Sequence, residues 1–585
     1  MKMYTELGAF TLPSDFNFEV ELINPLFTDE GSSSLPFTLP LTKDNLAATD
    51  NPNVLARRER VIGRTECIVQ YGTFQLQGLL SVSSLSKSEL SGHIMISESR
   101  LYSERRDSTI RSIIQYERVY ENQLTIQGLA RALEYNNEAY ISQPEDDDYM
   151  PEEIAVFPVV GQFTDTYKLM LNGRVDESDE GGIAYGGLEY TARSIKVGSD
   201  TYNVPDGYGL TAFPFLSHII NLILRNLGYK VIRNDFQTQP FCNLVLLNPV
   251  ADAICGSTLY YKDLVPDITL SDFIEWLYDK FGAVICISGK SASVVLLAKV
   301  LQMPFDIDLT EYAEDDETLS IPEECSVHIS VETSLDGAEP VDTEYDYAVH
   351  SVGEFTTVDK ESQVSYKLGK YIYAKNTGKF YRKNQDGSNS IKTEAFAFSG
   401  NMWGSKNEDL SPADLYTPML SYSLYRPSYA VPYVGPFAHY HTAIKDSEEE
   451  EEATHPLMVC WVYYLNGYRC GTVCGHDAAG NRLTYGPDKT PLPALSPTGI
   501  YELCWSKYNS MLQDSAPEIT VKINLPLHLL QTLDMVCPKR YKGHKVIIKS
   551  LSYSVSASGI TYGDAKLQLI PEYVFPSSKT PYFPY

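Results

Sequence analysis

The chain has 585 residues, which corresponds to about four domains of ordinary size. It carries 47 basic and 76 acidic residues, and the resulting charge of −29 argues against a protein that grips nucleic acid through its phosphates. With 43% hydrophobic and 21% charged residues the composition is globular, and no apolar run reaches the roughly 18 to 20 residues of a membrane-spanning helix.

The first residues lack the apolar core of a secretion signal, so we expect no signal-dependent export. Residues 1–103 then favour strands. Residues 16–22 alternate apolar and polar with period two, and the proline-punctuated residues 34–41 suit an edge strand. Three further strand-like runs follow, at 66–71, 74–80 and 93–97. Short strands separated by turn signals predict a small barrel or sandwich here.

Residues 104–209 are a mixed β and loop segment. We expect a short helix within 109–120 and a buried strand at 154–160. The acidic runs Glu145–Asp148 and Asp176–Gly182 are interpreted as loops. The second resembles half of a calcium loop but lacks its alternating ligands and terminal Glu.

Residues 210–310 hold the clearest pattern. Apolar residues at helical spacing over 216–227 are followed by Gly228, which suits a helix end, and by a strand at 229–232. A second unit begins with Thr269 and Asp272, which form a capping pattern. It continues with an apolar stripe, a stopping glycine and a hairpin, at 273–281, Gly282, 283–287 and 293–297. Two such units predict a small α/β layer.

Residues 311–440 begin with an acidic linker at 311–317, followed by a hairpin formed by 370–374 and 379–383. A tyrosine-rich stretch comes next, comprising Tyr416, Tyr422, Tyr425, Tyr429, Tyr433 and Tyr440. Residues 441–585 are predicted as a C-terminal β domain. It contains a strong strand pair at 545–553 and 560–570, and it ends in an apolar tail at 582–585.

Two clusters raise the question of a metal. Cys470, Cys474 and His476 would need a fourth ligand such as Cys460 or Cys504, but their spacing matches no zinc module, and reduced structural thiols are the favoured interpretation. In an extended strand His439 and His441 would share a face, with His455 nearby in the sequence beyond the acidic loop 448–452. Neither cluster is assigned a metal.

Signatures of catalysis are missing from the sequence. The nucleophile elbow, the zincin motif, the phosphate loop and the dinucleotide fingerprint are all absent. We therefore expect no catalytic residue and no cofactor, although a scattered triad or carboxylate pair would leave no local trace.

The order of elements resembles the baseplate-hub or tail-tip proteins of phage tails and contractile injection systems. Members of that family carry a segment T-L-x-x-F-I-x-x-L-x-x-x-F-G before a hairpin. The matching residues here are Thr269, Leu270, Phe273, Ile274, Leu277, Phe281 and Gly282. The stretches SLPFTLPLTKDNLAA and RRERVIGRTECIVQYGTFQLQGLL are similar to tail proteins of Bacteroidetes phages and prophages.

This resemblance implies a predominantly β, α+β multidomain fold and a homotrimer. Two β-barrel-like tube domains, at 1–103 and 441–585, would form a pseudo-six-fold ring that adapts a hexameric tail tube to a trimeric tip, with the α/β layer outside. Tube, distal tail and fibre or spike proteins would be its partners, and the virion its location after synthesis in the host cytoplasm. DNA would pass an acidic lumen without specific binding.

Two alternatives stay open at this stage. The 42 tyrosines also suit a receptor- or glycan-binding tail protein or adhesin, because tyrosine stacks on ligands as readily as it fills strands. A cell-wall hydrolase attached to a tail tip is the other.

Overall fold

The structure is a computed structural model. It describes residues 1–27, 32–52, 65–96, 107–119, 126, 129, 153–164, 167–173, 190–255, 258–322, 325–332, 371–374, 379–383, 389–390, 394–398, 406–417, 419–421, 430–442, 455–465, 468–475, 483–485, 490–495, 497–513 and 516–571. Strand is the predominant element of these residues, as expected. None of their helices is both long enough and apolar enough to cross a membrane.

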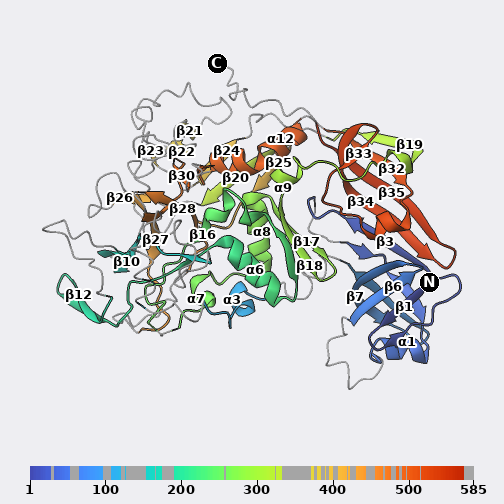
Figure 1. Ribbon diagram of the computed structural model, residues 1–585, viewed down its shortest axis with the longest axis horizontal. Helices are drawn as coiled ribbons and strands as arrows, with labels where there is room; N and C mark the ends of the chain where they lie inside the picture. Colours follow the sequence, from blue (N-terminus) through green and yellow to red (C-terminus); the bar gives the residue numbers. More distant parts are fainter. Residues whose placement is uncertain are drawn as a thin grey trace, which may run out of the picture.

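The largest sheet has thirteen strands and is built from both ends of the chain (Figure 1). Its strands are β1 (Lys2–Thr5), β2 (Gly8–Ala9), β3 (Asn17–Ile23), β4 (Ser33–Ser34), β5 (Phe37–Pro40), β6 (Thr65–Tyr71), β7 (Phe74–Leu85), β8 (Glu89–Met95), β19 (Ala313–Ser320), β32 (Glu518–Ile523), β33 (Lys539–Tyr541), β34 (His544–Ser556) and β35 (Ile560–Leu569).

Strand β3 joins the two halves of this sheet. It runs antiparallel to β34 from the pair Asn17–Ser556 to the pair Ile23–Ser550, and on its other side it pairs with β4. The described strands therefore do not support the expectation of two separate barrel-like domains. They form one open sheet that contains both predicted β regions, and no described sheet closes into a barrel.

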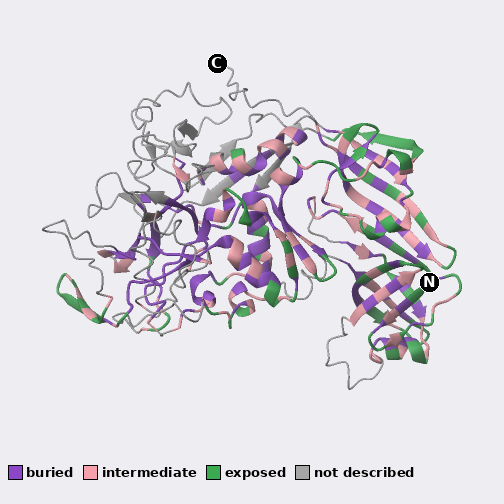
Figure 2. Ribbon diagram, in the orientation of Figure 1, coloured by how far each residue is buried: buried purple, intermediate pink, exposed green. Residues whose placement is uncertain are grey.

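The large sheet has a core of its own. The predicted alternation holds in β3, where Phe18 and Val20 are buried and Asn17, Glu19 and Glu21 are exposed. These side chains pack in one cluster with residues from the C-terminal strands, Leu551 and Val555 among them. Figure 2 shows the alternation as purple and green bands along the strands. Burial against a common core is what joins the chain ends.

The α/β layer forms as predicted. Helices α6 (Leu216–Asn226) and α8 (Leu270–Phe281) pack beside a sheet in which β15 (Lys230–Asn234) lies parallel to β18 (Ser291–Leu296), which pairs with β17 (Ala283–Ser288).

The ends of these helices match their sequence signals. Gly228 and Gly282 take positive φ angles of 89° and 60°, and the Thr269 hydroxyl accepts a hydrogen bond of 3.1 Å from the Asp272 N–H.

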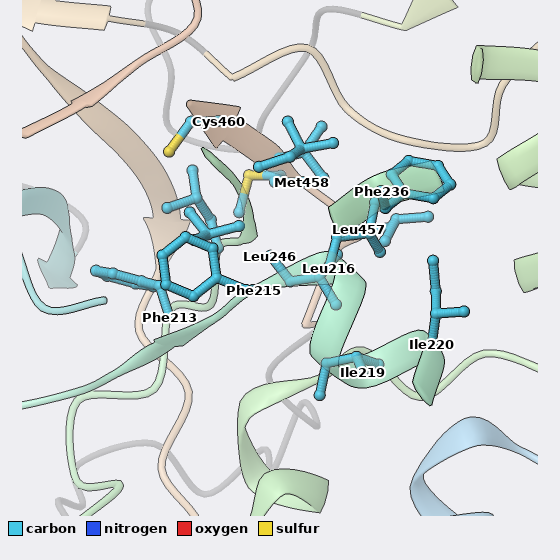
Figure 3. Close-up of a cluster of buried hydrophobic side chains, with 14 of the residues drawn as sticks. Phe213, Phe215, Leu216, Ile219, Ile220, Phe236, Leu246, Leu457, Met458 and Cys460 are labelled. Atoms are coloured by element: carbon cyan, nitrogen blue, oxygen red, sulfur yellow. The ribbon is translucent and has the colours of Figure 1, made fainter. Parts of the chain in front are cut away.

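A larger central core surrounds this layer and draws on residues beyond 440. Helix α6 packs with Phe213, β16 (Leu244–Leu246) and β28 (Val459–Leu465) (Figure 3). Strand β28 pairs antiparallel with β16, at Leu244–Trp461 through Leu246–Val459. A strand from the C-terminal segment is thus part of the core next to the α/β layer.

The remaining elements are short. The other helices are α1 (Lys43–Ala48), α3 (Ile110–Ile113), α7 (Tyr261–Leu264), α9 (Leu297–Val300), α11 (Pro497–Ile500), α12 (Ser506–Gln513) and α13 (Leu527–Gln531), with single turns at Asp235–Gln237, Phe241–Asn243, Thr310–Tyr312 and Tyr501–Trp505. The other strands are β9 (Ile154–Ala155), β10 (Val159–Thr164), β11 (Tyr167–Leu171), β12 (Arg193–Val197), β13 (Asp200–Val204), β14 (Phe213–Pro214), β20 (Cys325–Glu332), β21 (Tyr371–Ala374), β22 (Lys379–Lys383), β23 (Asn389–Ser390), β24 (Glu394–Phe398), β25 (Lys406–Leu410), β26 (Met419–Ser421), β27 (Ala430–Pro436), β29 (Tyr468–Thr472), β30 (Thr484–Tyr485) and β31 (Thr490–Pro491).

The short helix expected within 109–120 is confirmed as the single turn α3. One local prediction needs correction. The acidic segment 311–317 is not a linker, because residues from Ala313 onward form the strand β19. The hairpin at 370–374 and 379–383 is confirmed as β21 and β22.

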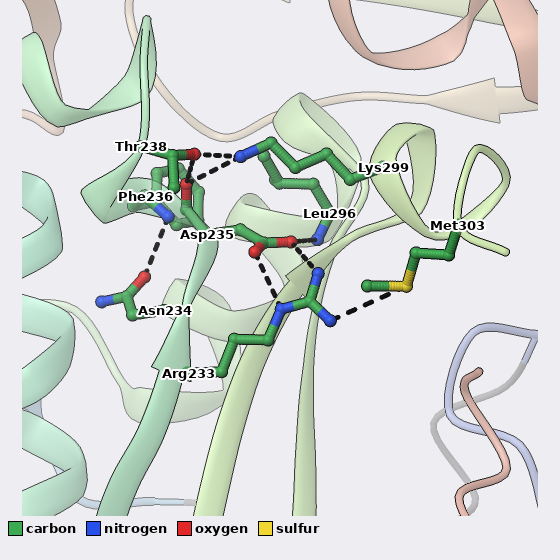
Figure 4. A network of polar contacts seen from close by, with 8 residues as sticks. All are labelled: Arg233, Asn234, Asp235, Phe236, Thr238, Leu296, Lys299 and Met303. Atoms are coloured by element: carbon green, nitrogen blue, oxygen red, sulfur yellow. Dashed lines mark hydrogen bonds and ion pairs between the residues drawn. The ribbon is translucent and has the colours of Figure 1, made fainter. Parts of the chain in front are cut away.

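A polar network fastens the end of the α/β layer (Figure 4). The buried Asp235 carboxylate accepts two bonds of 2.9 Å from Arg233 and one of 3.0 Å from the Leu296 N–H. Lys299 donates to the Asp235 carbonyl at 3.3 Å and also contacts the Thr238 hydroxyl. These contacts link β15 to the end of β18 and the start of α9.

Candidate functional site

Three histidines singled out by the sequence lie around one polar cluster. We define the histidine cluster as Arg111, Tyr208, Asp252, Asp263, His439, Tyr440, His441 and His455. Arg111 lies in α3, Tyr208 in a turn, Asp252 in the loop before α7 and Asp263 in α7. The remaining members lie in the two segments that flank 443–454.

Asp252 organises this cluster through the backbone. Its side chain is buried, and its carboxylate accepts bonds from the N–H groups of Tyr440, His441 and Thr442 at 3.0, 2.7 and 2.8 Å. The Thr442 hydroxyl adds a fourth bond at 3.0 Å. A carboxylate satisfied in this way fixes the path of residues 440–442, and its oxygens are already engaged with protein donors.

His439 and His441 turn to different partners. The His439 ring stacks on Tyr208, with centroids 5.8 Å apart, and its Nε2 lies 2.9 Å from the Tyr208 hydroxyl. His441 Nε2 lies 3.7 Å from Asp263 Oδ2. The two residues follow β27 in a loop rather than a strand, so the predicted shared face is wrong.

His455 is held as a neutral ring. Its Nδ1 lies 3.0 Å from Arg111 Nη2, and because Arg is always a donor, that nitrogen accepts the bond. Burial, and after it the Arg111 guanidinium, lowers the pKa of His455 to about 3. Arg111 also donates to the Val265 carbonyl at 2.8 Å and contacts the Tyr440 hydroxyl, so it ties α3 to the histidine cluster.

The contacts of the histidine cluster suit a structural role, because they hold separate segments of the chain together. In the described part of the chain, no group of three or more His, Cys, Asp or Glu side chains is arranged to hold a metal ion. Cys470 and Cys474 are buried on and just after β29, and His476 lies outside the described residues.

The two suggested fourth ligands are buried thiols. Burial raises the pKa of Cys460 and Cys504 well above the ordinary value. Thiol burial in the central core agrees with the interpretation as small apolar residues.

A buried ion pair was not signalled by the sequence. Lys280 on α8 contacts Asp414, and their side chains are 2% and 1% exposed. The neighbouring Asp279 accepts a bond of 3.3 Å from the Ser411 N–H, and burial raises its pKa to about 6. Residues 411–414 are thereby attached to the helix of the resemblance motif. Helical spacing gave no sign of this pair, because Lys280 lies in a position that reads as solvent-facing.

The large sheet also presents an acidic edge. Strand β19 lies at one end of its described strand order, and the residues from Glu314 to Ser320 are exposed. Glu314 pairs with Lys522 at 3.2 Å and Glu317 with Lys542 at 2.9 Å. Hydrogen bonds from Asn524 and Tyr541 respectively lower the pKa of these two carboxyls. Leu319 and Ile321 remain 59% and 70% exposed.

Several marked segments lie outside the described residues. They are the acidic runs Glu145–Asp148 and Asp176–Gly182, the loop 448–452, the tyrosines 422, 425 and 429, and the tail 582–585. Tyr416 and Tyr433, by contrast, are buried in the central core.

No family model and no curated protein matches the sequence. Three solved structures are similar along nearly the whole chain. The 43 kDa tail protein of prophage MuSo2 from Shewanella oneidensis has 7% identity and a TM-score of 0.30, covering 97% of each chain. Prophage tail protein gp18 from Listeria monocytogenes EGD-e has 7% identity and a TM-score of 0.31, covering 97% of this chain and 93% of its own. The tail protein from Neisseria meningitidis MC58 has 7% identity and a TM-score of 0.28, covering 98% and 96%. Scores at this level do not establish a shared fold.

Proposed function

We propose that the chain is a structural protein of a phage tail, at the baseplate hub or tail tip, and that it acts by geometry without chemistry of its own. It assembles as a homotrimer, matches a hexameric tail tube to a trimeric tip and lines part of the DNA path. Its partners are tube or distal tail proteins on one side and fibre or spike proteins on the other.

One observation carries this proposal. The N-terminal and C-terminal β segments lie side by side in a single sheet with a common core. Each half contributes antiparallel strands and one short helix, α1 or α13. We infer that the two halves of this single sheet serve as two similar modules, so that a trimer would present six of them, the number that a hexameric tube requires.

The resemblance motif gives a second support. The segment from Thr269 to Gly282 forms a capped helix that ends at a left-handed glycine and leads directly into the β17–β18 hairpin. This is the local structure that the hub resemblance implied for these residues.

The charge is compatible with a DNA-conducting role. A chain with a net charge of −29 repels phosphate, and its acidic residues include an exposed strand at the edge of the large sheet. A wall of this kind lets DNA slide past without binding it.

Electron microscopy of particles from the phage or prophage that encodes the chain tests the proposal. Antibody against this chain, detected with gold, is expected at the end of the tail distal to the capsid. Mass spectrometry of the same particles is expected to give one copy for every two subunits in a ring of the tube. Label distributed along the fibres would favour the receptor-binding alternative, and particles that lack the chain would contradict the proposal.

A further inference from the structure

Two strands of the large sheet separate and leave a groove between them. We define the strand groove as the space between the start of β3 and strand β5, with a volume of about 740 Å³. The lining residues used below are Asp15, Asn17, Glu19, Phe37, Thr38 and Glu89. The groove lies in the N-terminal half of the sheet, away from the histidine cluster.

The separation has a local cause. Strands β3 and β4 pair only at Val20–Ser34 and Glu21–Ser33, and the ladder ends where the Leu35 N–H donates to the Glu19 carbonyl at 2.9 Å. Pro36 follows and has no N–H with which to continue the ladder. From there the chain continues as β5, which pairs with β8 alone.

Among the residues that the structure describes, no strand therefore pairs with the groove-facing edge of the start of β3 or of β5. In β3 the even residues face β34, as shown by the bond from the Asn24 N–H to the Lys549 carbonyl, so the N–H and C=O of Asn17 point to the groove. In β5 the bond from the Leu41 N–H to the Ser88 carbonyl sets the odd residues toward β8. The N–H and C=O of Thr38 point the other way.

Aromatic rings close the floor. Phe37 packs edge to face against Phe16 and Phe18, with centroids 5.8 and 5.9 Å apart. These side chains are at most 8% exposed, so the floor is part of the core of the sheet. An apolar side chain that points down from an inserted strand would meet this floor.

The rim has one sign of charge. Asp15, Glu19 and Glu89 are exposed, and none of the described residues that line the groove is Lys or Arg. The Asn17 side chain donates to Glu19 Oε1 at 3.3 Å. A cationic side chain on the outward face of an inserted strand would meet these acids.

We propose that the strand groove binds an extended, basic segment of a partner protein by strand addition. The segment alternates apolar residues, which face the phenylalanine floor, with Lys or Arg, which face the acidic rim. Its backbone pairs with Thr38 on one side and Asn17 on the other and so closes the gap in the sheet. This inference goes beyond the proposed function and stands on the groove alone.

Fluorescence anisotropy with the full chain tests it. The probe is a labelled nine-residue peptide of alternating Lys and Val, and the control peptide carries Glu in place of Lys. We expect saturable binding of the Lys peptide that weakens with salt, and no binding of the Glu peptide. Absence of saturable binding of the Lys peptide overturns the proposal.

Variants locate the binding. Thr38→Pro removes the N–H that faces the groove without touching the β8 ladder and is expected to weaken binding about 10-fold or more. Thr38→Val keeps that N–H and is expected to bind like the unchanged chain. The surface double variant E19K/E89K is expected to abolish binding even if Thr38→Pro fails to fold. Unchanged affinity in the charge-reversed variant, or in a folded Thr38→Pro, contradicts strand addition in this groove.

Discussion

The α/β layer and the large sheet are assembled from the chain in different ways. The layer is built from one continuous segment, residues 216–300. The large sheet instead joins segments that are far apart in the sequence, as the hydrogen bond from the Asn24 side chain to the Ile548 carbonyl shows, 524 residues away. A layer of this kind can form early through local contacts, but the sheet needs both chain ends. The large sheet, through which we propose that the chain assembles, therefore depends on both ends of the chain.

The strongest test of the central core removes one partner of its buried ion pair. We expect Lys280→Met or Asp414→Ala to lower the free energy of unfolding by about 3–5 kcal/mol, because each leaves an unpaired buried charge. Urea unfolding followed by tryptophan fluorescence measures this, since Trp276, Trp461 and Trp505 lie in that core. The double variant K280M/D414L is expected to regain much of the loss; no recovery would show that the ion pair is not the cause.

Phe18→Ala is the corresponding test of the core of the large sheet. This ring is fully buried between strands of both chain ends, and its loss is expected to cost about 3–5 kcal/mol. Hydrogen exchange should show β34 and β6 losing protection together, while α8 keeps its protection. Loss confined to the N-terminal strands would mean that the two halves of the sheet fold separately. The exposed neighbour Glu19→Ala serves as the control.

Acid should weaken the central core through His455. The pKa of His455 is about 3 in the folded chain and 6.5 in the unfolded chain. Between these two pH values the unfolded chain therefore binds a proton at His455 that the folded chain does not bind. Stability is then lost as pH falls from 6.5 toward 3, by roughly 2–3 kcal/mol at pH 4.5. Urea midpoints of the unchanged chain and of His455→Gln check this prediction. Equal slopes with pH in the two proteins would contradict it.

The smallest expected effect concerns the helix of the resemblance motif. Thr269→Ala removes the hydroxyl that caps α8 and should cost about 1 kcal/mol. Thr269→Ser keeps the acceptor and should be close to neutral. The tryptophan unfolding transition measures both, and equal losses for the two variants would rule out capping as the reason.

Short sequence patterns predicted those helices and strands whose formation depends on residues close together in the chain. Helices α6 and α8 with their glycine ends, strand β3 and the β34–β35 pair follow from periodicity and from residues that cap or stop an element. The acidic pattern of residues 311–317 predicts a linker where β19 forms, because its acidic residues meet Lys522 and Lys542 only in the folded sheet.

The polar sites were harder to predict for a similar reason. Asp252 binds backbone N–H groups almost 190 residues away, and backbone donors leave no mark in a sequence. The histidines at 439, 441 and 455 were recognised as a group, but their spacing could not show that each would take a different partner. The strand groove forms where the β3–β4 hydrogen-bond ladder ends and β5 pairs with β8 instead. Strand register decides this position, and short sequence patterns do not reveal register.

The oligomeric state of the full chain tests the central claim most directly. Light scattering on the purified 65.6 kDa chain, alone and mixed with the tail-tube protein of the same phage, measures the number of copies in the assembly. The account predicts a trimer, or a trimeric ring that forms once tube protein is added. A chain that stays monomeric under both conditions and does not bind the tube would contradict it.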